Sequence, residues 1–146
     1  MLLARLRLLV AVVWAGSLWT VGYLVAPTLF ATLSDRSLAG TIAGSMFHVQ
    51  AMASLVCGLL LMLLLWLATP EWRSVRRRKV LAIIAAMLLC TVAVHFGLQP
   101  MMAELRATGL VEEAVKSRFG LLHGVSSVIY LVESFLAVWL LISVTD

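Results

Sequence analysis

Long apolar runs alternate with short polar breaks along the chain, and this pattern predicts its elements. Apolar residues dominate four stretches, at about residues 6–31, 42–69, 80–98 and 119–144. Roughly 20 apolar residues are enough for a helix to cross a bilayer, so we interpret these stretches as membrane spans. The pattern therefore predicts an all-α integral membrane four-helix bundle, built as a single membrane domain over residues 1–146.

Three features refine the boundaries of these spans. Ser34 or Asp35 can cap a helix that starts after the first break. Residues 101–116 mix charged and apolar side chains, which predicts a short amphipathic helix or loop between spans three and four. The first run exceeds the roughly 7–15 apolar residues of a signal peptide, so we expect it to be retained as a span.

Composition agrees with a lipid environment. The chain is 63% hydrophobic and 12% charged, with a mean hydropathy of +1.08, whereas soluble domains carry about 25% charged residues. The net charge is +4, but the basic residues lie beside apolar runs, so we expect membrane lipids as partners and no nucleic acid. Cys57 and Cys90 lie within apolar runs and form no CxxC motif, which indicates small apolar side chains rather than a redox pair.

The distribution of basic residues predicts the topology. Seven of the 11 Lys and Arg residues fall on the side of the two termini and the second connection, and four fall on the other side. Because basic residues accumulate on the cytoplasmic side, we expect both termini in the cytoplasm, in the inner membrane of a bacterium. Trp66 and Trp72 flank the second connection, as is typical of a membrane interface. Its basic run is expected to contact lipid headgroups through Arg76, Arg77, Arg78 and Lys79.

With this topology, all three histidines fall at the non-cytoplasmic level of the bundle. His48 opens span two, His95 lies near the end of span three, and His123 opens span four. Imidazole suits copper, zinc and haem iron, and three convergent rings could hold a metal with one position open. The alternative is that these histidines only hydrogen-bond across helices.

Span four also carries a polar stripe, which consists of His123, Ser126, Ser127, Tyr130, Glu133 and Ser134 when read at about 100° per residue. Glu133 lies about 15 Å along the helix from His123, near the middle of the bilayer. An ionised carboxylate there costs on the order of 3 kcal/mol. No Arg or Lys in the span interiors can pair with it, so we expect Glu133 to be protonated or hydrogen-bonded to Ser, Thr or Tyr of facing helices.

A second polar stripe on span three includes Thr91 and Gln99. Two interpretations of the stripes stay open. In one, a proton passes from Glu133 through Tyr130 to His123. In the other, Glu133 is a protonated structural carboxyl.

Small residues and one proline predict how the spans pack. Gly40 and Gly44, and likewise Gly120 and Gly124, are spaced so that helix backbones can approach closely, either within the chain or against a partner. Pro27 removes a backbone donor and predicts a kink in span one. A homo-oligomer or a larger membrane complex is therefore among the expected assemblies.

Three runs carry a resemblance to a known family: Ala26–Leu33 (APTLFATL), Ala39–Phe47 (AGTIAGSMF) and Phe119–Ser126 (FGLLHGVS). The chain resembles the transmembrane-protein-205-like family, known in bacteria as a domain of unknown function. The resemblance covers nearly the whole chain. It implies a small multi-span membrane protein and no settled activity.

Three hypotheses for the function remain. The first is a binding protein that handles copper, zinc or haem through His48, His95 and His123. The second is a structural or accessory subunit of a larger membrane complex. The third is a small proton-coupled transporter built on the stripe from His123 to Glu133. The chain contains no P-loop, GxSxG or HExxH motif, so the pattern favours a protein that is not an enzyme.

Overall fold

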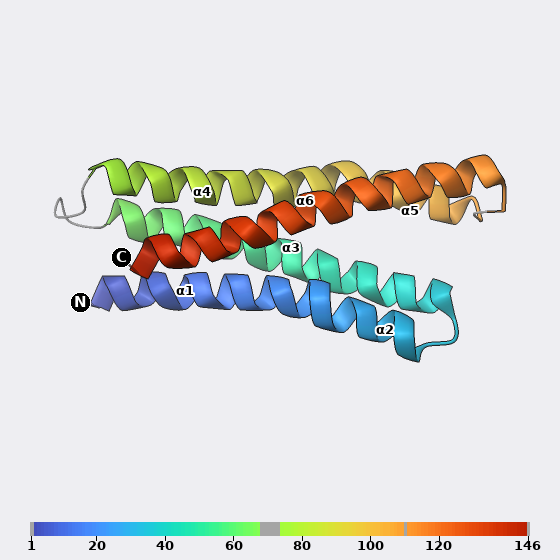
Figure 1. The fold of residues 1–146 in the computed structure, drawn as a ribbon, viewed down its shortest axis with the longest axis horizontal. Coiled ribbons are helices and arrows are strands. Elements are labelled where there is room, and N and C mark those ends of the chain that lie inside the picture. Colours follow the sequence, from blue (N-terminus) through green and yellow to red (C-terminus); the bar gives the residue numbers. More distant parts are fainter. Residues whose placement is uncertain (1, 68–73, 110, 146) are drawn as a thin grey trace.

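The computed structural model describes residues 2–67, 74–109 and 111–145, and these form four long helical rods that lie side by side (Figure 1). This part of the chain contains no strand, so the predicted all-α bundle is confirmed. Each rod holds a helix long and apolar enough to cross a membrane. The rods are, in order, α1 (Leu2–Trp19), η1 (Thr20–Val25) and α2 (Ala26–Thr32); α3 (Arg36–Trp66); α4 (Ser74–Val92), η2 (Ala93–Leu98) and α5 (Gln99–Ala107); and α6 (Glu113–Thr145).

The order of the rods around the bundle is given by their contacts. Helix α1 packs against α3 and α6, and α4 packs against the same two helices. Both ends of the chain lie at one end of the bundle, here called the terminal end (Figure 1). The connections from α2 to α3 and from α5 to α6 lie at the opposite end, here called the turn end (Figure 1). The predicted placement of the terminal end in the cytoplasm stays a prediction.

The helices extend beyond the predicted spans. Helix α3 begins at Arg36, ahead of the span predicted from residue 42, and the predicted cap is confirmed at Asp35. Its Oδ1 accepts hydrogen bonds from the backbone N–H groups of Ser37 at 2.8 Å and Leu38 at 3.1 Å. The third rod continues through Pro100 to Ala107. Of the predicted short amphipathic helix or loop, residues 101–107 therefore form the end of this rod in α5, and residues 113–116 begin α6.

A π-helical segment precedes each proline inside a rod. Segment η1 ends two residues before Pro27, and η2 ends two residues before Pro100. Proline lacks a backbone donor and its ring crowds the carbonyl of the preceding turn. The wider π-helical turn relieves this crowding and lets the rod continue. Pro27 therefore lies within a continuous helical rod whose pitch changes ahead of it.

The two halves of the bundle differ in packing. The terminal half is filled by an apolar cluster that includes Trp14, Leu61, Ile84, Met87 and Leu140, all fully buried. The turn half contains buried polar side chains and three cavities. The two halves meet where Trp14 Nε1 donates a hydrogen bond to Ser54 Oγ at 2.9 Å.

The basic run after the second connection begins α4. Trp72 and Arg73 of the predicted interface lie outside the described residues. Arg76 donates from Nε and Nη2 to the Ser143 carbonyl oxygen at 3.3 Å, which places a cation at the C-terminus of α6. Lys79 Nζ lies 5.2 Å from the centre of the Trp139 ring. The expected lipid contacts of Arg77, Arg78 and their neighbours stay predictions.

Candidate functional site

A buried polar layer crosses the middle of the bundle and includes Gln50, Ser54, Thr91 and Glu133, of which Glu133 is the carboxylic acid. The Glu133 side chain on α6 is only 3% exposed. Thr91 on α4 donates from Oγ1 to Glu133 Oε1 at 2.8 Å, and the same hydroxyl lies 3.2 Å from the Met87 carbonyl oxygen of its own helix. The expected hydrogen bond between Glu133 and a hydroxyl of a facing helix is therefore confirmed.

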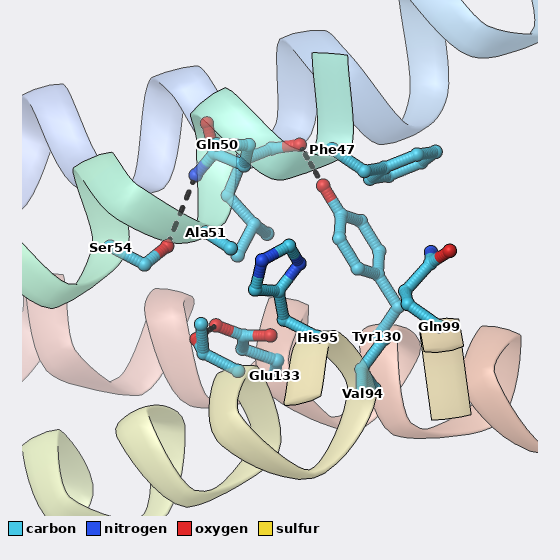
Figure 2. A pocket seen from close by; sticks show the side chains of 11 residues that line it. Phe47, Gln50, Ala51, Ser54, Val94, His95, Gln99, Tyr130 and Glu133 are labelled. Atoms are coloured by element: carbon cyan, nitrogen blue, oxygen red, sulfur yellow. Dashed lines mark hydrogen bonds between the residues drawn. The ribbon is translucent and has the colours of Figure 1, made fainter. Parts of the chain in front are cut away.

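A small cavity of about 40 Å³ adjoins Glu133 (Figure 2). A buried water needs about 10–15 Å³ of such volume, so this space has room for water. Every rod contributes to the lining, and its polar members are Gln50, Ser54, Thr91, His95, Gln99, Tyr130 and Glu133. Figure 2 shows the His95 ring and the Glu133 carboxyl, which come from different rods, directed toward this common space.

Tyr130 contacts two other rods at the edge of this cavity. Its hydroxyl donates to the Leu18 carbonyl oxygen at 2.6 Å, just ahead of η1 (Figure 2). Its ring meets Phe47 edge-on, with ring centres 5.5 Å apart. Gly22 of η1 lies directly against the ring, because a Cβ added there would overlap Tyr130 atoms. The π-helical segment thus brings a bare backbone against Tyr130.

Tyr23 and Ser134 add a second bond between α6 and the first rod. Their hydroxyl oxygens lie 2.8 Å apart. Ser134 donates its proton to the Tyr130 carbonyl oxygen at 2.9 Å, so Tyr23 is the donor between the two hydroxyls.

The structure brings together two of the three histidines. His48 Nδ1 on α3 and His95 Nε2 on η2 lie 3.0 Å apart, with ring centres at 4.9 Å. His123 instead stacks on Phe119, with ring centres 6.2 Å apart and a 3° angle between the rings. Phe47 and Gln99 line both the cavity that contains His95 and the cavities that contain His123.

This arrangement does not fit the predicted metal or haem site. Within the described ranges, no group of three or more His, Cys, Asp or Glu side chains could hold a metal ion. His48 and His95 share one hydrogen bond, while the ring of His123 packs on Phe119 of its own helix. The alternative interpretation, hydrogen bonding across helices, describes His48 and His95.

Two larger cavities open in the turn half. The first, of about 380 Å³, is here called the arginine cavity because Arg36 and Arg106 line it. The second, of about 470 Å³, is here called the tyrosine cavity because Tyr23 and Tyr130 line it. Both cavities share the lining residues Phe30, Phe47, Gln99 and His123.

The residues of the predicted relay line different cavities. Thr91, Gln99, Tyr130 and Glu133 line the small cavity together. Ser126 and Ser127 line the tyrosine cavity with His123. Both serine hydroxyls donate to the His123 carbonyl oxygen, at 2.9 Å and 2.8 Å, so their own helix satisfies them.

The predicted packing glycines face open space or ordinary contacts. A Cβ added at Gly40 would lie 3.9 Å from atoms of Phe30 and Arg106. At Gly44, Gly120 and Gly124 it would meet nothing within 4 Å. Close packing of these glycines against a partner chain therefore stays a prediction. Within the chain, close approaches occur instead at Gly22 and at Gly58, where a Cβ would lie 2.6 Å from Leu88.

Sequence reasoning missed the contribution of α3 to the site. Gln50 Nε2 donates to Ser54 Oγ at 3.2 Å, and both side chains line the small cavity (Figure 2). Their spacing was a usable signal, since polar residues four apart share one helix face. Phe47 carried no such signal, because an aromatic residue in an apolar run is ordinary in a membrane span.

Comparison with known proteins gives a family and no activity. Residues 9–110, more than half of the chain, match the family model described as a domain of unknown function (DUF4149). The match covers the first three rods nearly completely and ends before α6. No curated protein and no solved structure matches the chain. The resemblance to the transmembrane-protein-205-like family stays a prediction.

Proposed function

We propose that this chain, which belongs to the DUF4149 family of unknown function, is a small proton-coupled membrane carrier in which Glu133 binds the proton. One observation carries this proposal: a carboxyl that is 3% exposed lies beside a polar cavity, within a helix apolar enough to span a membrane. Ionisable groups inside membrane spans are costly and commonly mark ion or proton pathways.

The packing difference between the halves supports a carrier. The cavities lie on the turn side of Glu133, whereas the apolar cluster around Trp14 and Leu140 fills the terminal side. A carrier exposes its site to one side of the membrane at a time. This geometry fits a state in which Glu133 is reached from the turn end and closed off from the terminal end.

The polar side chains have distinct parts in this scheme. Thr91 donates to Glu133 and so stabilises the carboxylate after the proton has left. His95 and Tyr130 share the small cavity with Glu133, where water can connect them. His123 lines both larger cavities and is placed to exchange protons with the turn side.

A pH-jump experiment tests the proton-binding role without a known substrate. Proteoliposomes that contain the full chain are adsorbed on a solid-supported electrode, and the pH is changed rapidly. We expect a transient current as protons enter the protein, and its loss in Glu133→Gln. The matched control is Glu113→Gln, whose side chain is 91% exposed, and which should keep the current. A current of unchanged size in Glu133→Gln would overturn the proposal.

The accessory-subunit hypothesis is favoured by the outer surface of α6. Gly120 and Gly124 are exposed, and a Cβ at either meets nothing within 4 Å. This leaves a face at which another helix could approach closely. Crosslinking in native membranes tests it: a discrete heteromeric product, lost in Gly124→Leu, would support a larger complex.

Metal or haem handling through three histidines does not fit the geometry, since only His48 and His95 meet. Elemental analysis and visible absorption of the purified protein test it directly. Stoichiometric metal or a haem absorption band, lost in His95→Ala, would favour this function over the carrier.

A further inference from the structure

We propose that the arginine cavity is the substrate site of this carrier and that it takes an anionic amphiphile, a carboxylate or phosphate head on an apolar chain. This inference rests on the proposed function in that it names the class of molecule carried. Its binding step can nevertheless be measured without transport.

The charges of the cavity select an anion. Arg36 from the start of α3 and Arg106 from α5 both line it, and the described residues of its lining include no carboxylate. Arg106 Cζ lies 5.4 Å from the centre of the Phe119 ring, which holds the guanidinium beside an aromatic face. Neither arginine forms an ion pair with another described residue. Two uncompensated guanidinium groups favour a carboxylate or phosphate, which they can bind by charge-assisted hydrogen bonds.

Apart from Ser37, Gln99 and His123, the remaining lining is apolar and selects an apolar body. Phe30, Phe47 and Phe119 line the cavity, and Met102, only 3% exposed, lines it from α5. A Cβ at Gly44 would meet nothing within 4 Å, so the glycine leaves this volume open. About 380 Å³ falls within the range of small-molecule sites, which bury mostly apolar ligand surface.

The cavity is also placed to couple with Glu133. Gln99 and Phe47 line both the arginine cavity and the small cavity beside Glu133. A ligand that displaces either side chain would change the surroundings of the proton-binding carboxyl. An anion that enters with a proton crosses the membrane with less net charge, which lowers the cost of the step.

Binding is measured on the full chain in nanodiscs of zwitterionic phosphatidylcholine, titrated with dodecanoate and, for comparison, with dodecanol. We expect saturable binding of dodecanoate and weaker binding of dodecanol. The double variant Arg36→Gln/Arg106→Gln should lose at least about tenfold in affinity, as expected for charge-assisted hydrogen bonds. Gly44→Leu should lose binding by filling the cavity, with both arginines kept.

Two controls isolate the cavity. Arg118→Gln removes a cation near the same end that does not line the cavity, and Gly16→Leu adds the same side chain in α1 where a Cβ meets nothing within 4 Å. Both should bind dodecanoate as the wild type does. Equal affinity in the wild type and the double arginine variant, or no saturable binding at all, would overturn the inference.

The occupant has two sources, a membrane lipid or a free carboxylate. Competition with phosphatidylglycerol distinguishes them: displacement of dodecanoate by this lipid supports a lipid anion in the cavity, and the absence of displacement supports a free carboxylate.

The experiments also distinguish failure of this inference from failure of the proposed function. A pH-jump current without dodecanoate binding contradicts only the inference, and dodecanoate binding without the current contradicts only the proton-binding role.

Discussion

The hydroxyl of Thr91 links α4 to Glu133 on α6 within the buried layer. Thr91→Val keeps the shape of the side chain but removes the donor to Glu133, which is 3% exposed. We expect a loss of about 0.6 kcal/mol in the free energy of unfolding, and at most about 1.7, as for other hydrogen bonds between membrane helices. Reversible unfolding in mixed detergent micelles measures it.

The matched control is Thr41→Val. Thr41 is exposed and donates only to the Ser37 carbonyl oxygen of its own helix, at 3.0 Å. Its replacement should leave the free energy of unfolding unchanged. Equal losses of unfolding free energy in both variants would mean that the loss comes from helix propensity and not from the contact with Glu133.

Gly22 and Gly16 give a second comparison between single residues. A Cβ at Gly22 would overlap the Tyr130 ring, whereas a Cβ at Gly16 would meet nothing within 4 Å. We expect Gly22→Ala to lower the free energy of unfolding by about 1–3 kcal/mol, as overpacking does. It should also break the hydrogen bond from the Tyr130 hydroxyl to the Leu18 carbonyl oxygen. Gly16→Ala should be neutral or stabilising, because alanine favours the helix. Unfolding of both variants under the same conditions measures the difference.

Among the elements, each π-helical segment sets the direction of the helix that comes after it. In η2, the π-helical turn accommodates one residue more than an α-helix of the same rotation, so a further residue would rotate α5 by about 100° relative to α4. Phe96 is 57% exposed, so an alanine can be inserted after it in η2 with little change in packing. We expect this insertion to turn Gln99, Met102 and Arg106 out of the cavities while helix content is kept.

Circular dichroism and dodecanoate titration measure these two outcomes. A glycine inserted after Gly109, in the turn between α5 and α6, is the control, because it changes length outside the helices. It should leave dodecanoate binding intact. Unchanged affinity in the variant with the insertion after Phe96 would show that η2 does not set the direction of the α5 side chains that line the cavities.

The elements also show which features of the fold and of the candidate site could be predicted from the sequence. Apolar length alone predicts four spans, and the isolated polarity of Glu133 predicts its buried hydrogen bond. Periodicity at 100° per residue cannot predict a π-helical turn, which shifts every later residue around the axis. The sequence pattern therefore did not predict which way the His95 side chain points or how far α5 extends. It also did not predict that His123 lies apart from the histidine pair.

At the scale of the molecule, an apolar cluster packs the terminal half, which also buries Arg7 and Ser143, whereas two larger cavities open in the turn half. The polar layer with Glu133, Thr91 and Ser54 lies between them, near the middle of each rod. The two larger cavities lie on the turn side of this layer, so the proposed function depends on orientation. As a carrier of the proposed kind, the protein takes up substrate and proton from the compartment that the turn end faces.

The basic residues predict that orientation, and labelling can test it. Arg5, Arg7, Arg76, Arg77, Arg78 and Lys79 lie on the rods at the terminal end, and Arg36, Arg106, Lys116 and Arg118 lie at the turn end. After Cys57 and Cys90 are replaced by Ala, single cysteines report each end. We expect Ser34→Cys to react with a membrane-impermeant maleimide in intact cells, and Val75→Cys, 77% exposed in the fold, to react only after permeabilisation.

A charge variant shows whether the basic residues cause this orientation. Replacing Arg76, Arg77, Arg78 and Lys79 by Gln leaves three basic residues on the terminal side, counting Arg73 from the sequence, against four on the turn side. Because orientation depends on the excess of Lys and Arg in short connections, the variant should insert in both directions. Labelling of Ser34→Cys in intact cells should then be incomplete, with the remainder reacting after permeabilisation. Labelling that stays complete would mean that the apolar spans themselves fix the orientation.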